Sequence, residues 1–89
     1  MFVESIHMLH DQLYFRMPNR GIRTYSVDLV VSDPLTGEVL ARRTRPDAQL
    51  NGNWHIAINK PRDRVLVTFI VESAVAFQGL VSQQAIFGA

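Results

Sequence analysis

Three histidines are the side chains best suited to bind a metal ion. His7 and His10 are three residues apart, so on a helix both imidazoles would point to the same side, and His55 is the third. The chain has no cysteine, and only Glu4 and Asp11 flank the pair. A closed zinc site needs four such ligands, so we interpret the histidines as surface or interface residues and predict no metal and no cofactor.

The groups that carry out acyl or phosphoryl transfer lack the surroundings that such chemistry needs. All five glycines are isolated, so no glycine-rich phosphate loop is expected, and no serine lies in a G-x-S-x-G elbow. Asp47 and Asp63 both fall in predicted loops, where aspartates usually bond their own backbone. We therefore predict a protein without enzymatic activity.

Arginines are the most prominent polar feature. If the strands run as a simple meander, one end of the domain carries a basic rim of Arg20, Arg23, Arg42, Arg43 and Arg45. A second basic group, Lys60, Arg62 and Arg64, would lie at the opposite end beside the turn at 33–37.

The basic rim could bind phosphates or a partner's carboxylates, because guanidinium groups bind both. Alternatively, the rim is a solvated surface whose charge Asp47 partly neutralises. The net charge is only +1 and no aromatic residues are interleaved with the arginines. We therefore predict no sequence-specific nucleic-acid binding.

The elements that must position these groups are predicted to be strands, because apolar and polar residues alternate along most of the chain. Val30 and Val39 flank a turn at Asp33–Gly37, which contains Pro34, so a hairpin is expected there. The segment 65–71 is apolar on both faces, which places it in the middle of a sheet. The residues predicted to be buried are Leu29, Val31, Trp54, Ile56, Ile58, Val65, Val67 and Phe69.

Several segments remain open. Residues 1–11 have helical spacing of apolar side chains but also suit an extended arm, and 46–54 is dense in turn formers and is predicted to be a loop. Residues 74–87 suit one strand bent at Gly79 or two short strands. We expect an all-β fold: residues 1–89 form one small antiparallel β-sandwich, immunoglobulin-like or transthyretin-like, with six to seven strands and an N-terminal arm or short helix.

The stretch VDLVVSDPLTGEVLARRTRPDAQLNGNWHIAI resembles carboxypeptidase-regulatory-like and Cna-B-like domains, which share the transthyretin-type sandwich. The matching positions are Asp33, Thr36, Gly37, Thr44, Gly52 and Trp54, and the resemblance covers about residues 24–73. It implies a structural or adhesive module. It does not extend to the Cna-B isopeptide crosslink, which needs a lysine on an early strand, because Lys60 is the only lysine and falls in a turn.

The composition of the chain indicates that it packs against other proteins. The chain of 89 residues is 47% hydrophobic and lacks cysteine, basic residues before Arg16 and an apolar run of signal-peptide length. No charge follows Glu72, which leaves residues 74–89 as an apolar C-terminal strand or tail. We predict contact with protein partners through apolar side chains near both ends. These are Phe2, Val3, Ile6, Phe77, Leu80, Val81, Ile86 and Phe87.

The leading hypothesis is a structural protein of a larger assembly. We expect a tailed-phage virion component, such as a capsid decoration, neck or tail protein, made in the host cytoplasm and present as a homo-oligomer or beside other virion proteins, with no membrane contact. The alternative is a cytoplasmic inhibitor or adaptor that binds a single host protein through the basic rim. A third possibility is a cytoplasmic sandwich that binds a small ligand.

Overall fold

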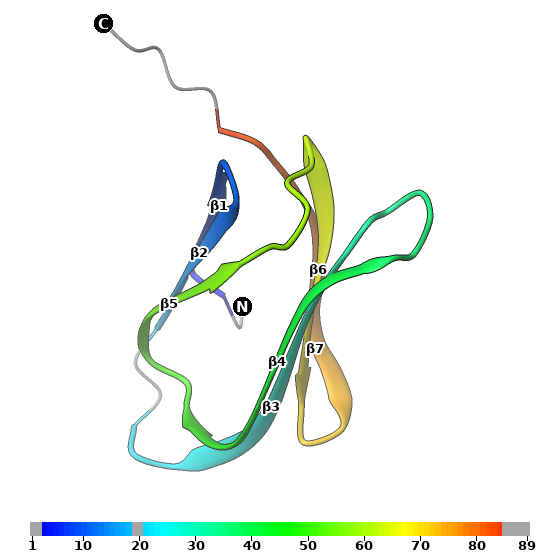
Figure 1. Cartoon of the computed structure of the whole chain (residues 1–89). Helices are drawn as coiled ribbons and strands as arrows, with labels where there is room; N and C mark the ends of the chain where they lie inside the picture. The colour runs from blue at the N-terminus through cyan, green and yellow to red at the C-terminus, as the bar shows by residue number, and fades with distance from the viewer. Residues whose placement is uncertain (1–2, 19–20, 85–89) are drawn as a thin grey trace, which may run out of the picture.

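The computed structural model describes residues 3–18 and 21–84, which form seven strands in two sheets packed face to face (Figure 1). The strands are β1 (Ser5–Leu9), β2 (Gln12–Met17), β3 (Thr24–Ser32), β4 (Val39–Gln49), β5 (Gly52–Ala57), β6 (Arg64–Val71) and β7 (Ala74–Ser82). One sheet has the order β1-β2-β5 and the other β4-β3-β6-β7, and all paired strands are antiparallel. The predicted β-sandwich is confirmed, and residues 5–9 take the extended alternative.

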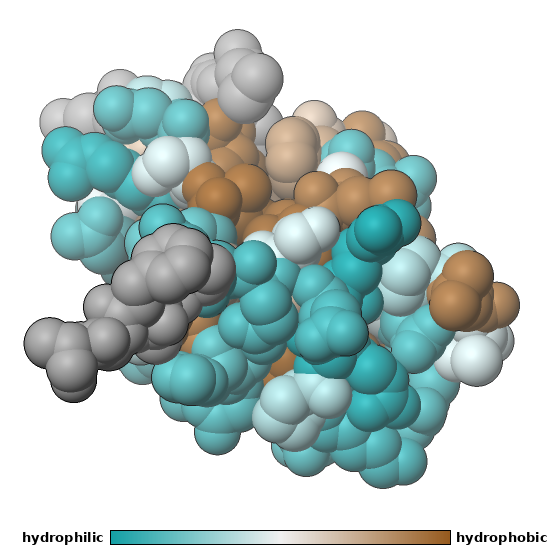
Figure 2. Space-filling model, turned by 90° about the horizontal axis from the view of Figure 1, so that it is seen from above, coloured by the Kyte–Doolittle hydropathy of each residue, from teal (hydrophilic) through white to brown (hydrophobic). Residues whose placement is uncertain are grey.

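The core lies between the two sheets, and alternation along the strands directs one face of each sheet into it. All eight residues predicted to be buried are buried. Phe69 of β6 is fully buried and meets the rings of Phe15, Trp54 and Phe77 edge-on, with centroid distances of 5.1, 6.4 and 6.4 Å. Seen from above, apolar side chains gather between polar ones (Figure 2).

The turn between β3 and β4 has the geometry that its sequence predicts. The Gly37 N–H donates to the Asp33 carbonyl at 2.9 Å, and one Asp33 carboxylate oxygen accepts from the N–H groups of Leu35 and Thr36 at 2.8 and 3.1 Å. Gly37 has a φ of 78°, which favours glycine. These backbone donors, with Arg62, lower the pKa of Asp33.

The second basic group lies beside this turn, as predicted. Lys60 contacts Glu38 at 2.8 Å, and Arg62 contacts Asp33 at 3.1 Å and Glu38 at 3.4 Å. The ammonium of Lys60 lowers the pKa of Glu38. These pairs tie the β5–β6 connection to the β3–β4 turn.

The prediction of a loop over 46–54 is wrong, because β4 runs on to Gln49 and β5 begins at Gly52. Pro46 suggests a strand end, since it has no N–H to donate, but an edge strand tolerates proline at a bulge. β4 is the edge of its sheet, and the pairing passes from Val27–Arg45 directly to Tyr25–Ala48. Pro46 lies in the irregularity between these two pairs.

The C-terminal segment forms one strand, β7, and its irregularity lies at Ala76 rather than at Gly79. The pairing passes from Phe69–Phe77 to Ile70–Val75, so Ala76 is the extra residue. Just beyond β7, Gln83 bridges the sheets: its side chain bonds backbone groups of His10 and Arg62, and its N–H donates to Asp63. Gln83 therefore joins the two sheets at one point, just beyond the end of β7.

Candidate functional site: an exposed apolar sheet face and an arginine-lined cleft

The apolar residues predicted to contact a partner differ in how exposed they are. Val3 and Val81 are only 2% and 7% exposed and belong to the core, so the prediction that they face a partner is wrong. Ile6 and Phe77 are half-buried against the core. Leu80 is 59% exposed. Phe2, Ile86 and Phe87 lie outside the described residues.

The exposed Leu80 is one of several apolar side chains on the outer face of the four-stranded sheet. Directly opposite it on β6 is Leu66. Beyond the polar Thr68–Gln78 pair on the same face, Ile70 is paired with Val75, which is 62% exposed. Val30 of β3 is also half-buried on this face. We call these five residues the β7 face: Val30, Leu66, Ile70, Val75 and Leu80.

The edge of β7 beside this face is also open. Gln83 donates its N–H to Asp63 on the β6 side, whereas Gln84 donates to Met8 on the other side at 2.9 Å. Since backbone groups alternate along a strand, those of Gln78, Leu80 and Ser82 point away from β6. Within residues 3–18 and 21–84, no ladder joins another strand to this edge of β7, and the bridge between Met8 of β1 and Gln83 lies just beyond the end of β7.

The predicted basic rim is divided by the structure. Arg42 lies on the outer face of β4 and pairs with Asp28 at 2.7 Å, which lowers the pKa of Asp28 and raises that of Arg42. Arg43 and Arg45 point the other way, because their cross-strand partners, Leu29 and Val27, are buried.

Of the remaining rim residues, Arg23 is not among those that line the cleft described below. Arg23 lies over the ring of Tyr25, with 4.7 Å between its guanidinium carbon and the ring centroid. Arg20 lies outside the described residues. The prediction of one rim of five arginines is therefore wrong for Arg42. It assumed that a shared end of two strands suffices, whereas alternate residues face opposite sides of a sheet.

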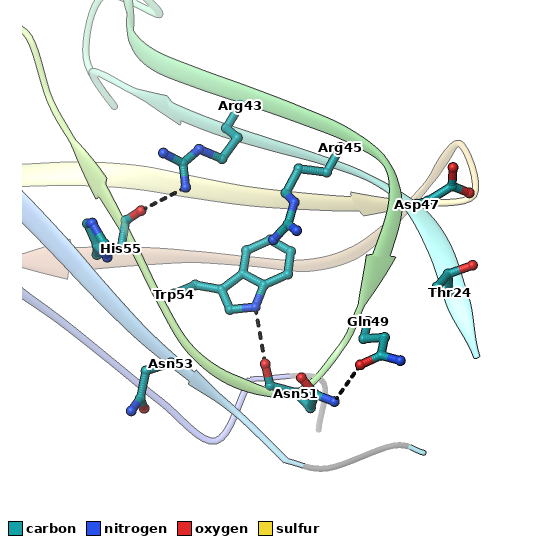
Figure 3. A pocket seen from close by; sticks show the side chains of 9 residues that line it. All are labelled: Thr24, Arg43, Arg45, Asp47, Gln49, Asn51, Asn53, Trp54 and His55. Carbon is teal, nitrogen blue, oxygen red and sulfur yellow. Dashed lines mark hydrogen bonds between the residues drawn. The ribbon is translucent and has the colours of Figure 1, made fainter. Parts of the chain in front are cut away.

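Arg43 and Arg45 line a cleft of about 550 Å³ between β4 and β5 (Figure 3). Arg43 donates to the His55 carbonyl at 3.2 Å, and the Arg45 guanidinium lies 5.0 Å from the centre of the Trp54 ring system. Trp54 in turn donates its indole N–H to the Asn51 carbonyl at 3.2 Å. The remaining lining residues are polar: Thr24, Asp47, Gln49, Asn51, Asn53 and His55. We call this the β4–β5 cleft.

The cleft exists because β4 and β5 meet only at their ends. The Asn59 N–H donates to the Leu40 carbonyl at 3.1 Å at one end, and a short connection joins the strands at the other. Between these points no ladder joins the two strands, and they belong to different sheets. Arg43 is long enough to bridge the gap to the edge of β5.

The two cleft arginines lack acidic partners. Arg16, Arg42, Lys60 and Arg62 each contact a carboxylate within the described part of the chain. Neither Arg43 nor Arg45 does so among these residues, although Asp47 also lines the cleft. The cleft therefore contains two guanidinium groups that form no ion pair with the described residues.

The histidines do not share a helix face, because His7 lies on β1 and His10 in the following turn, with a φ of 56°. His7 stacks on Tyr14 with centroids 5.1 Å apart, and Tyr14 lies 6.5 Å from His55. Across residues 3–18 and 21–84, no three histidine, aspartate or glutamate side chains gather as a metal site. The same residues include no apolar helix of membrane-spanning length.

No known protein family, curated protein or solved structure matches the chain. The resemblance to carboxypeptidase-regulatory-like and Cna-B-like domains stays a prediction.

Proposed function

We propose that this chain is a structural protein that assembles with copies of itself through β7. The observation that carries the proposal is the conjunction of an open strand edge with an exposed apolar face, both belonging to the same strand. Monomeric proteins usually protect such an edge with charges, bulges or a covering element, and they keep apolar patches small. β7 contains no charged residue, and its bulge at Ala76 leaves the pairing of Phe77–Ser82 with β6 regular.

A second copy is the occupant that the surface suits best. Two β7 edges related by a two-fold axis run antiparallel, so each edge meets the same edge of its partner. In such pairing residue i of one β7 faces residue j of the other, and because β7 carries no charged residue, no register places like charges opposite each other. Val75 and Leu80 would then lose water on the outer face, which favours association.

The narrower expectation of a tailed-phage virion remains a prediction. Repeated copies of one small sandwich are a requirement of such a particle, and self-pairing through β7 would meet it. The alternative of an adaptor that binds one partner through arginines is supported by the unpaired Arg43 and Arg45 in the β4–β5 cleft.

Light scattering coupled to size-exclusion chromatography tests the proposal on the full chain. We expect a dimer or larger species that becomes monomeric in Leu80→Lys and in Val75→Lys, because both substitutions place a charge in the contact. Ile22→Lys is the matched control, since Ile22 is 88% exposed and lies outside the β7 face. A monomer at all concentrations, or equal dissociation of the control, would show that β7 is not an assembly surface.

A further inference from the structure

We propose that the β4–β5 cleft binds an extended acidic segment of a partner protein, which lies along the free edge of β5 and pairs its carboxylates with Arg43 and Arg45. This site is separate from the β7 face, because β4 and β7 are the opposite edges of their sheet.

The edge of β5 has free pairing positions. Ile58 donates its N–H to Asp11 on the β2 side, and Asn59 donates to Leu40 on the β4 side. Alternation then turns the backbone groups of Asn53, His55 and Ala57 toward the cleft. The His55 carbonyl confirms this direction, because it accepts from the Arg43 side chain. An added strand would use the same backbone positions.

The charge of the cleft selects an acidic segment. Arg43 holds a neutral carbonyl at 3.2 Å, and Arg45 lies over an aromatic ring, so both exchange a weaker contact for a carboxylate. A carboxylate can accept two parallel hydrogen bonds from one guanidinium group, which adds both energy and geometric specificity to the contact. Arg43 and Arg45 are two residues apart on one face of β4, and this spacing matches alternate side chains of a neighbouring extended segment.

A peptide fits this site better than a nucleic acid does. Trp54 is the only aromatic side chain that lines the cleft apart from His55, and Arg45 covers its ring. A base therefore finds no open indole face to stack on.

An inward-pointing arginine on an edge strand also has a purely protective use, since such a charge discourages edge-to-edge pairing. That use predicts a cleft that binds no strand. The two explanations are separated by a binding experiment with defined peptides.

The probe is a capped eight-residue peptide of alternating Glu and Val, compared with the matched Lys and Val peptide and with inorganic phosphate. Binding is followed by calorimetry and by the fluorescence of Trp54, the chain's single tryptophan. We expect the Glu peptide alone to bind and to change the emission. Arg43→Gln combined with Arg45→Gln should weaken binding by at least about tenfold, the equivalent of about 1.4 kcal/mol.

Arg42→Gln is the matched control, because Arg42 is on the same strand but faces Asp28 on the other side. It should change affinity by less than about twofold. If the double variant does not fold, the single variant Arg43→Gln is used in its place, because it keeps the contact of Arg45 with Trp54. The proposal is overturned if the Glu peptide does not bind, if Arg42→Gln weakens binding as much as the cleft variants, or if phosphate binds in its place with the same arginine dependence.

The proposed function and this inference fail separately. Leu80→Lys should abolish self-association without changing peptide affinity, and the cleft variants should bind less peptide without changing the oligomeric state. If Leu80→Lys also abolishes peptide binding, the cleft is not an independent site.

Discussion

Replacing Phe69 by alanine tests how the two sheets are held together. Phe69 is fully buried and contacts three other aromatic rings, two of them from the opposite sheet: Phe15 on β2 and Trp54 on β5. Deleting a buried Phe side chain costs about 3–5 kcal/mol through lost burial and the cavity left behind. Loss of each edge-on ring pair costs about 0.5–1.5 kcal/mol beyond its area, so the upper end of that range is expected.

This loss is large relative to the stability of the whole domain. At about 0.05–0.15 kcal/mol per residue, the free energy of unfolding of 89 residues is roughly 4–13 kcal/mol. Phe69→Ala should therefore leave a domain that is marginal or unfolded. Phe69→Leu keeps an apolar group in place and should cost about 1–2 kcal/mol, mainly the ring contacts.

Urea denaturation followed by circular dichroism measures these differences. The midpoint should fall in the order wild type, Phe69→Leu, Phe69→Ala at a similar slope, and Ile22→Ala should stay within about 0.5 kcal/mol of wild type. If Phe69→Ala lies as close to wild type as Ile22→Ala does, Phe69 does not hold the sheets together, and the register of β6 is wrong.

Three further predictions concern turns and ion pairs. Gly37→Val should lower the free energy of unfolding by about 1–2 kcal/mol and Gly37→Asn by much less, as measured by thermal unfolding. Gly37 has a φ of 78°, which a β-branched side chain rarely adopts and asparagine tolerates. Steric clash does not contribute, because nothing lies within 4 Å of an added Cβ. Equal melting temperatures for the two variants would refute this. Ser73→Gly should raise stability by about 1 kcal/mol, because Glu72 and Ser73 have φ values of 52° and 67° in the β6–β7 turn, and a lower midpoint in urea would contradict it. The folded state depresses the pKa of Asp28, Asp33 and Glu38, so their contribution to stability should be fully present above about pH 5 and should be lost as pH falls below about 4 through the folded values. A melting temperature that rises on acidification would show that these carboxylates do not stabilise the fold.

Local patterns explain which parts of the fold are predictable. The turn at Asp33–Gly37 is specified by residues that bond each other, so its geometry follows from five positions. The core residues follow from alternation, because only one strand face can be buried. β4 was harder to predict, since a proline ends most strands and the bulge that accommodates Pro46 depends on its partner strand β3.

The candidate surfaces show the limits of sequence reasoning more clearly. Val3 and Val81 look like Leu80 in the sequence, and only the packing of the sheets separates buried from exposed valines and leucines. Arg43 and Arg45 differ from Arg42 by the parity of their position. The sequence does contain the information that separates them, because counting alternate residues from Ala41 places Arg43 and Arg45 on the same face of β4 as Ala41. The cleft between β4 and β5 could not be predicted in this way, because it depends on how the two sheets pack against each other.

Hydrogen–deuterium exchange at low and high protein concentration tests the assembly through β7 most directly. The N–H groups of Gln78, Leu80 and Ser82 point away from β6, so pairing with a second β7 would bury some of them in new hydrogen bonds. We predict that exchange along β7 slows as concentration rises, while exchange in β6, which is paired on both sides, stays the same. Rapid exchange of the β7 edge at every concentration at which the protein associates would show that association uses another surface.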